Sequence, residues 1–278
     1  MAQKFHPTSR GQIAYDKRGL GDPLLLVHGI YPGASHEEFH RNLRPLSDHF
    51  TIYAIDLLGF GDSEKPNITY TAQLYEHLLR DFIIEVIGQA THVMASGTSC
   101  GPATALAVYN HALVGKLVLI DPGNEKAAGQ HPPTVAARLQ QFLLGRLSMG
   151  VGLYETMSSR YELKQFLRTR YSNPRHVTDQ RVAELHERAS RRHAMYPYIS
   201  YLTGHLATDV IRWLRYVPNQ VLILWGSDAG PPPADKLLPP AGRSNDRRIE
   251  IIPQAAHWPH DEQSAMVNRI VIEFLYGT

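Results

Sequence analysis

The stretch of sequence that decides the fold spans residues 92–108 and reads HVMASGTSCGPATALAV. It opens with an apolar run, His92–Ala95, that is typical of a buried strand, and it closes with a helical run, Ala103–Val108. Between the two runs lies the pattern G-x-S-x-G. In a strand–turn–helix setting this pattern predicts a nucleophile elbow, a tight turn with small residues at Gly97 and Gly101 that exposes the hydroxyl of Ser99. The alternative is a glycine-rich turn without a catalytic role.

A serine hydroxyl becomes a nucleophile only beside a general base that a carboxylate holds in place. His257 follows the last predicted strand, Ile249–Ile252, and Asp228 follows the strand Val221–Leu224. Both therefore lie where the carboxyl ends of parallel strands form the site of an open α/β sheet. We predict Ser99, His257 and Asp228 as nucleophile, base and orienting acid.

Rivals to the base and the acid lie close by in the sequence. His260 comes three residues after His257 and is expected to lie on the surface or at the start of a helix. Asp121 ends the strand Leu117–Ile120, and its expected role is to hydrogen-bond the loop that follows. Asp235 can serve as the acid only if the proline-rich loop before it folds back towards His257.

An acyl-transfer site also needs two backbone N–H groups that stabilise a developing oxyanion. One is expected from Cys100, the residue after the predicted nucleophile, and the other from Ile30, where Gly29 lets the backbone approach the site. His28 is expected to brace this loop. Tyr31, Tyr196, Tyr198 and Trp258 are candidates to line a substrate pocket.

Further apolar runs on both sides of the central stretch predict a mostly parallel sheet with helices on both faces. Four of these runs are Leu24–Val27, Thr51–Ile55, Leu117–Ile120 and Val221–Leu224, and Gln12–Lys17 reads as an antiparallel edge strand. Strand patterns stop between positions 123 and 205, where helical patterns such as Val135/Leu139/Phe142/Leu143 take over. We predict a core of residues 1–122 and 206–278, interrupted by a helical cap at residues 123–205.

Composition limits the classes of protein that fit this chain. Its 278 residues include 28 Lys and Arg against 26 Asp and Glu, a balance that argues against a dedicated nucleic-acid binder. One cysteine excludes an intrachain disulfide and a multi-cysteine metal site. Without an apolar leader or a run long enough to span a bilayer, we expect a cytoplasmic protein without a membrane partner. No pattern specifies an oligomeric state.

Taken together, these motifs resemble the α/β-hydrolase superfamily, in its lid-bearing branch of serine esterases and C–C bond hydrolases. The resemblance covers about residues 12–122 and 206–278 and is carried by these segments: Val27–Gly29, Asp56–Ser63, Gly97–Gly101, Leu119–Pro122, Leu224–Gly226 and His257–His260. It implies a Ser99–His257–Asp228 triad, an acyl-serine intermediate and neither a cofactor nor a metal. The acid motif usually reads G-x-x-D, whereas Asp228 follows Gly226 by only two residues, so Asp121 stays open as the acid.

We therefore expect a serine hydrolase that cleaves carboxylic esters of small to medium, mostly apolar substrates. One alternative is a C–C bond hydrolase of the dienone-acid type, because the loop from His28 to Ser35 is similar to the oxyanion loop of such enzymes. The other alternative is a member of the fold that binds a ligand under the cap, or cyclises it, without hydrolysis.

Overall fold

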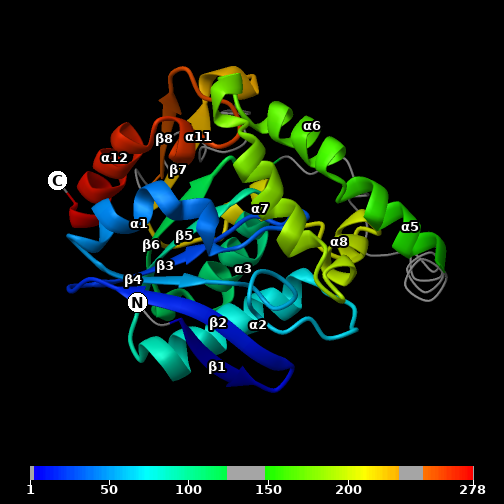
Figure 1. Ribbon diagram of the computed structural model, residues 1–278. Coiled ribbons are helices and arrows are strands. Elements are labelled where there is room, and N and C mark those ends of the chain that lie inside the picture. Colours follow the sequence, from blue (N-terminus) through cyan, green and yellow to red (C-terminus); the bar gives the residue numbers. More distant parts are fainter. Residues whose placement is uncertain (1–2, 124–147, 232–246, 278) are drawn as a thin grey trace.

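The computed structural model describes residues 3–123, 148–231 and 247–277 of the chain (Figure 1). Within these residues eight strands form one sheet in the order β1-β2-β4-β3-β5-β6-β7-β8. β1 and β2 run antiparallel to each other, β2 runs antiparallel to β4, and the remaining neighbours are parallel. The strands are β1 Lys4–Thr8, β2 Gly11–Arg18, β3 Pro23–Val27, β4 Thr51–Ile55, β5 Thr91–Ser96, β6 Val114–Ile120, β7 Val221–Gly226 and β8 Arg247–Ile252.

Helices pack on both faces of this sheet. Figure 1 shows α1 and α12 on one face and α2 and α3 on the other. The described helices are α1 His40–Ser47, α2 Ala72–Phe82, α3 Cys100–Tyr109, α5 Ser148–Met157, α6 Arg160–Arg170, α7 Asp179–Ala189, α8 Met195–Leu202, α9 Val210–Leu214, α11 Pro259–Glu262 and α12 Ser264–Tyr276. Among the described residues no helix is both long and apolar enough to cross a membrane.

The central strands are continuously apolar because both of their faces are covered. In β3, Leu24 and Leu26 join the cluster that packs with α1 and α12, whereas Leu25 and Val27 join the cluster that packs with α2 and α3. All four side chains are fully buried. This alternation explains why the parallel strands read as unbroken apolar runs in the sequence.

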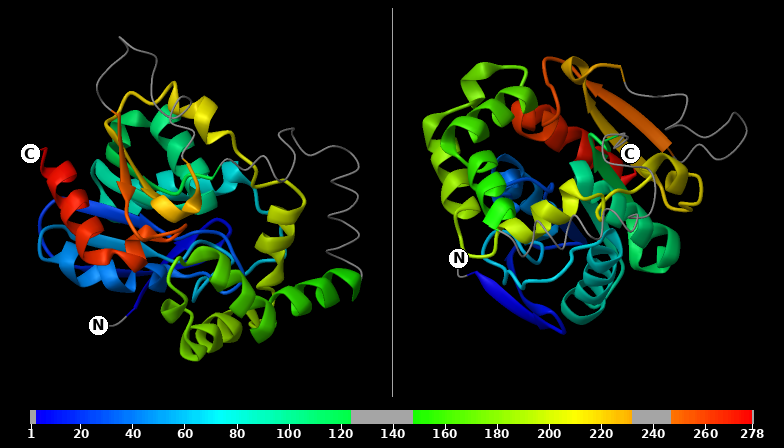
Figure 2. Two further views of the ribbon diagram at one scale, coloured as in Figure 1. Left: turned by 90° about the horizontal axis from the view of Figure 1, so that it is seen from above. Right: turned by 90° about the vertical axis from the view of Figure 1, so that its right-hand side faces the viewer.

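Strand register brings the loops that follow β3, β5, β6 and β7 to one edge of the sheet. Val27 pairs with Ala95, Ser96 pairs with Ile120, and Ile120 pairs with Leu224. The residues after each strand therefore lie side by side, as expected for the ligand-binding end of an open α/β sheet. The helices α5 to α8 lie to one side of the sheet in both views of Figure 2.

The predicted strands are all present, and the structure adds β1 at the edge of the sheet. The helices α5 to α8 confirm that helical structure replaces strands over residues 148–202. The helical pattern predicted at Val135–Leu143 and the acid candidate Asp235 lie outside the described residues. The cap boundaries at 123 and 205 stay a prediction.

Candidate active site

The turn after β5 has Gly97, not Ser99, at its apex. β5 ends at Ser96, Gly97 adopts a left-handed backbone with φ of +53°, and α3 begins at Cys100. A Cβ atom placed on Gly97 would meet no atom within 4 Å, so the side-chain position at the apex is open space. In a nucleophile elbow the strained apex residue is the one that presents its side chain to the substrate. Here that residue has no side chain.

Ser99 is turned away from the predicted base. Its side chain is fully buried, and its Oγ donates a 2.6 Å hydrogen bond to the carbonyl oxygen of His28. Its backbone is right-handed, with φ of −69° and ψ of −13°. The prediction that Ser99 is exposed at the elbow is therefore wrong, because the turn reaches its apex two residues earlier. The hydroxyl of Ser99 instead fastens the loop after β3.

Cys100 is not placed to stabilise an oxyanion. Its backbone N–H donates to the carbonyl oxygens of Gly97 and Thr98 within the turn, and its Sγ contacts the carbonyl oxygen of Ala95 at 3.3 Å. The predicted role of its amide is therefore wrong. The prediction that Gly101 must be small is confirmed, since a Cβ there would lie 1.8 Å from Thr208 Oγ1.

His257 contacts Asp121, the rival acid, and not Asp228. The Nδ1 atom of His257 lies 2.7 Å from Oδ2 of Asp121. The two side chains keep 32% and 11% of their surface exposed, respectively. Because this contact occupies Nδ1, Nε2 is the ring nitrogen left to exchange a proton with a molecule in the cavity.

Asp121 reaches His257 through an unusual backbone conformation. It is the first residue after β6, its φ is +44°, and its N–H donates to the carbonyl oxygen of Leu224 at 2.9 Å. A left-handed backbone at a residue other than glycine costs on the order of 1 kcal/mol and is concentrated at functional sites. The strand pairing thus holds the carboxylate in a strained position beside the imidazole.

Asp228 is exposed and lies in a different environment. Its carboxylate accepts hydrogen bonds from the hydroxyls of Ser172 and Ser227, of which the second is 2.8 Å long. The hydrogen bond from Ser172 lowers the pKa of Asp228, with Ser227 adding to the effect. The prediction that Asp228 orients His257 is wrong, because its side chain is engaged by these two serines.

The loop that carries His257 is fixed from two directions. The N–H of His257 donates to the carbonyl oxygen of Arg170 at 3.0 Å, which ties it to the end of α6. The N–H of Ala256 donates to Glu262 at 2.7 Å. The loop of His257 is therefore held by α6 and by α11.

A buried carboxylate holds the loop after β3. Glu38 accepts hydrogen bonds from the N–H of Gly29 and from the hydroxyl of Tyr31, both at 2.9 Å. Burial opposes ionisation of Glu38, but the neighbouring His260 outweighs burial and lowers the pKa of Glu38 to about 2. His260 lies 3.4 Å from this carboxylate, fully buried at the start of α11. The expectation of a helix start is confirmed for His260, whereas a surface position is wrong.

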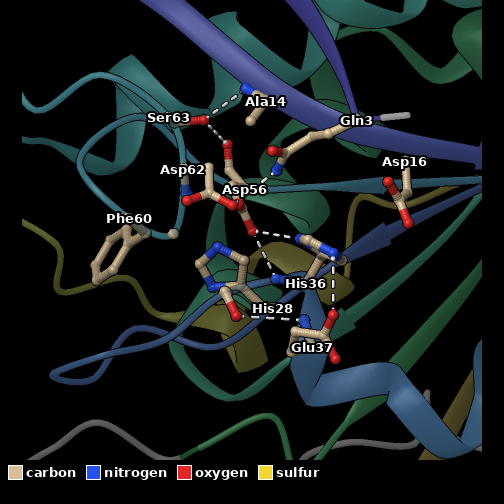
Figure 3. Close-up of polar contacts among 12 residues, drawn as sticks. Gln3, Ala14, Asp16, His28, His36, Glu37, Asp56, Phe60, Asp62 and Ser63 are labelled. Atoms are coloured by element: carbon tan, nitrogen blue, oxygen red, sulfur yellow. Dashed lines mark hydrogen bonds and ion pairs between the residues drawn. The ribbon is translucent and has the colours of Figure 1, made fainter. Parts of the chain in front are cut away.

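A second buried network lies behind the same loop (Figure 3). Asp56 is fully buried and accepts hydrogen bonds from the N–H and the Nδ1 of His36, at 2.7 and 2.8 Å, and from the N–H of Asp62 at 2.8 Å. The ring of His28 accepts a hydrogen bond from the N–H of Leu57 at 3.0 Å. His28 therefore braces the loop as the sequence suggests, and it contributes no side chain to the cavity lining.

A cavity of about 470 Å³ lies over the apex of the turn and opens to His257 and Asp121. Gly29, Ile30, Ser96, Gly97 and Thr98 form its floor. Its walls are mostly aromatic and consist of Tyr31, Phe166, Tyr198, Tyr201, Trp225 and Trp258. Three of the four predicted pocket residues thus line the cavity. The fourth, Tyr196, does not and packs against the ring of His193.

Arg170 adds the cationic group of this cavity lining. Its guanidinium lies over the ring of Phe166, 5.0 Å from the ring centre. Its Nε is buried without a hydrogen-bond partner among the residues that the structure describes. No pattern in the sequence pointed to Arg170, because one arginine in an arginine-rich helix resembles any solvated residue.

Comparison with known proteins shows the family to which the chain belongs. The model of the alpha/beta hydrolase family matches residues 24–270. The chain belongs to the alpha/beta hydrolase family. A 2-hydroxy-6-oxo-6-(2'-aminophenyl)hexa-2,4-dienoic acid hydrolase of Metapseudomonas resinovorans is 36% identical over 121 residues, which cover 42% of this chain and 41% of that relative. A 2-hydroxy-6-oxo-6-phenylhexa-2,4-dienoate hydrolase of Comamonas testosteroni is 26% identical over 272 residues, covering 95% and 91%.

The structural comparison agrees on the fold. A meta-cleavage product hydrolase from Pseudomonas fluorescens IP01 superposes with a TM-score of 0.76 at 20% identity and covers 99% of this chain and 97% of its own. This alpha/beta hydrolase therefore shares its fold with that protein.

Proposed function

We propose that this alpha/beta hydrolase is a C–C bond hydrolase for small dienone acids, with His257 as general acid–base and Asp121 as its orienting partner. The single observation that carries the proposal is the 2.7 Å contact between His257 Nδ1 and Asp121 at the mouth of the cavity. An imidazole held in this way presents Nε2 to the substrate and can accept or return a proton there. The relatives named above, hydrolases of dienoic acids, support this bond type over the ester.

The lining of the cavity supports an aromatic or conjugated acid as substrate. The rings of Tyr31, Phe166 and Trp258 all contact one another, with centre-to-centre distances of 5.4 Å (Tyr31–Phe166), 5.1 Å (Tyr31–Trp258) and 6.0 Å (Phe166–Trp258), and together they form an apolar wall. Planar conjugated molecules pack well against such walls. Arg170 supplies a guanidinium on the same lining, and a guanidinium binds a carboxylate through paired, charge-assisted hydrogen bonds. A dienone acid has both the conjugated body and the carboxylate.

The loop of Gly29 and Ile30 is proposed to face the carbonyl under attack. Glu38 fixes Gly29 from behind, so that the loop keeps its position while charge develops on the substrate oxygen. The amide of Ile30, on the cavity floor, stays our candidate for one oxyanion donor.

The test is a substrate panel with the purified protein. We expect turnover of 2-hydroxy-6-oxo-6-phenylhexa-2,4-dienoate, followed through loss of its conjugated absorbance, and at least about 100-fold lower kcat/KM for short nitrophenyl esters. Efficient ester cleavage without dienone turnover would replace the proposal with the esterase that the sequence suggests.

A matched pair of variants tests the substrate class within the same panel. Arg170→Met should raise KM for the dienone acid by about 10- to 100-fold, because a charged hydrogen-bond donor is lost. It should leave turnover of the methyl ester of the same compound nearly unchanged. Arg168→Met, on the exposed side of the same helix, is the control and should change neither. An equal loss for acid and methyl ester contradicts recognition of the carboxylate.

One observation favours a second candidate, a ligand-binding member of the fold without hydrolysis. The apex of the turn carries no side chain, which is also the arrangement expected where no bond is cleaved. Binding of the dienone acid with micromolar affinity, with no product after prolonged incubation, would select this candidate.

A further inference from the structure

The open space above Gly97 lies between the groups that an attack on a carbonyl requires. Gly97 shares one cavity with His257 and Asp121 and with the backbone of Ile30. No atom lies within 4 Å of the place that its Cβ would occupy. The register explains this position, because Ser96 pairs with Ile120 and the next residues of the two strands are Gly97 and Asp121.

The hydroxyl of Ser99 and the thiol of Cys100, two and three residues after the apex, are directed elsewhere. Ser99 donates to the carbonyl oxygen of His28, and the Sγ of Cys100 contacts the carbonyl oxygens of Ala95 and Ile120. Ser96 is only 1% exposed, but it lines the cavity, as Thr98 does. The hydroxyls of Ser96 and Thr98, on either side of the apex, are therefore the side-chain nucleophiles that the experiment must exclude.

We propose that hydrolysis at this site forms no covalent bond to the enzyme, and that water in the space above Gly97 attacks the substrate directly. The proposal rests on the function proposed above. Nε2 of His257 takes a proton from the water while the water oxygen bonds to the ketone carbon, and the carbonyl oxygen becomes an oxyanion. The substrate reacts as its 2-keto tautomer, in which the carbon next to the attacked ketone is saturated. As the carbonyl re-forms, the C–C bond breaks, and its electron pair passes through the conjugated double bond to the 2-keto oxygen, which receives the proton from His257. The products are one carboxylic acid and one hydroxydienoic acid, and water is the only co-reactant.

Gly97 itself is the position for the first test. A serine introduced there by Gly97→Ser would place a hydroxyl at the apex, within the cavity that holds His257. We expect a fluorophosphonate probe to label Gly97→Ser at that position and to leave the wild-type protein unlabelled. Gly97→Ala is the matched control, since it carries the same strain at φ of +53° without a hydroxyl, and it should stay unlabelled.

Labelling of the wild-type protein at Thr98, Ser99 or another side chain of the turn overturns the proposal. So does failure of a folded Gly97→Ser to be labelled, because the space would then not be the site of attack. If the wild type turns over no substrate of the panel while only Gly97→Ser is labelled, the proposed function fails and the placement of the apex stands.

The second test follows the wild-type protein during turnover. Rapid acid quench and intact-mass measurement with the dienone acid should show only the unmodified protein at every time point. Ser99→Ala should keep kcat within about threefold, because its hydroxyl holds a loop and touches no substrate. A protein species heavier by the acyl fragment, or a loss of about 1,000-fold or more in Ser99→Ala, contradicts direct attack by water.

Discussion

The chain contains two aspartate–histidine pairs with nearly the same contact and very different surroundings. His36 Nδ1 lies 2.8 Å from Asp56, and His257 Nδ1 lies 2.7 Å from Asp121. The side chain of Asp56 is fully buried and that of His36 is 9% exposed, whereas His257 keeps 32% of its side-chain surface at the cavity. The first pair fixes the loops behind the site (Figure 3), and the second opens onto the cavity.

We propose that access to the cavity, and not the contact itself, separates a structural pair from a catalytic one. Asp56 already accepts hydrogen bonds from His36 and from the N–H of Asp62, so its oxygens are engaged within the protein. The contact with Asp121 uses Nδ1 of His257. This leaves Nε2, on a side chain that lines the cavity, to exchange a proton with a ligand. Substitution at the first pair should therefore act on stability, and substitution at the second on activity.

The largest expected effect comes from replacing each of the two histidines separately by glutamine. His257→Gln should lower kcat/KM by about 1,000-fold or more, because the general base is lost, while the free energy of unfolding stays within about 0.5 kcal/mol. His36→Gln should lower the free energy of unfolding by about 3 kcal/mol, because Asp56 is left charged and buried, and should keep kcat within about threefold. Urea unfolding and steady-state kinetics measure both. Equal losses of activity in the two variants would remove the distinction.

A smaller effect on stability is expected from pH at the buried pair. Burial lowers the pKa of His36, but the hydrogen bond and charge of Asp56 outweigh burial and raise it above its usual value. Burial raises the pKa of Asp56, but the same bond and the charge of His36 lower it to about 2.

The sign of the pH effect follows from these two shifts. A raised histidine pKa contributes stability that is complete below the usual value near 6.5 and lost as pH rises through the raised value. A lowered aspartate pKa contributes stability that is present above about 3.9 and lost as pH falls towards 2. The stability difference between wild type and His36→Gln should be largest between about pH 4 and 6.5 and shrink at higher pH. A difference that urea unfolding finds constant from pH 5 to 9 would contradict a charged pair.

The sheet was predictable from sequence because burial on both faces leaves unbroken apolar runs such as Leu24–Val27. β1 was missed because Lys4–Thr8 lies at the edge of the sheet, with three of its five residues exposed, and shows no such run. His257 was predictable for a similar reason, since it follows the last strand of the sheet. These features depend on local pattern and on chain order.

The nucleophile position was not predictable, because the small residues around β5 fit two frames. In one frame the apex is Ser99 and the small residues two positions away are Gly97 and Gly101. In the other frame the apex is Gly97 and the small residues two positions away are Ala95 and Ser99. Which frame holds depends on where the strand ends, and β5 ends at Ser96. A shift of two residues in that boundary moves a hydroxyl from the cavity to the carbonyl oxygen of His28.

The smallest expected effect on kcat/KM is that of a substitution at Asp228, which we compare with the same substitution at Asp121. Asp121 and Asp228 both follow parallel strands, but only Asp121 turns back to His257, through its left-handed backbone. Asp121→Asn should lower kcat/KM by about 100- to 10,000-fold, since the imidazole loses its orienting charge. Asp228→Asn removes the same charge from an exposed position that only Ser172 and Ser227 contact, and it should stay within about twofold of wild type. Equal losses of kcat/KM in the two variants would mean that Asp228 reaches His257 during catalysis. Asp228, which the sequence predicts, would then replace Asp121 as the acid that orients His257.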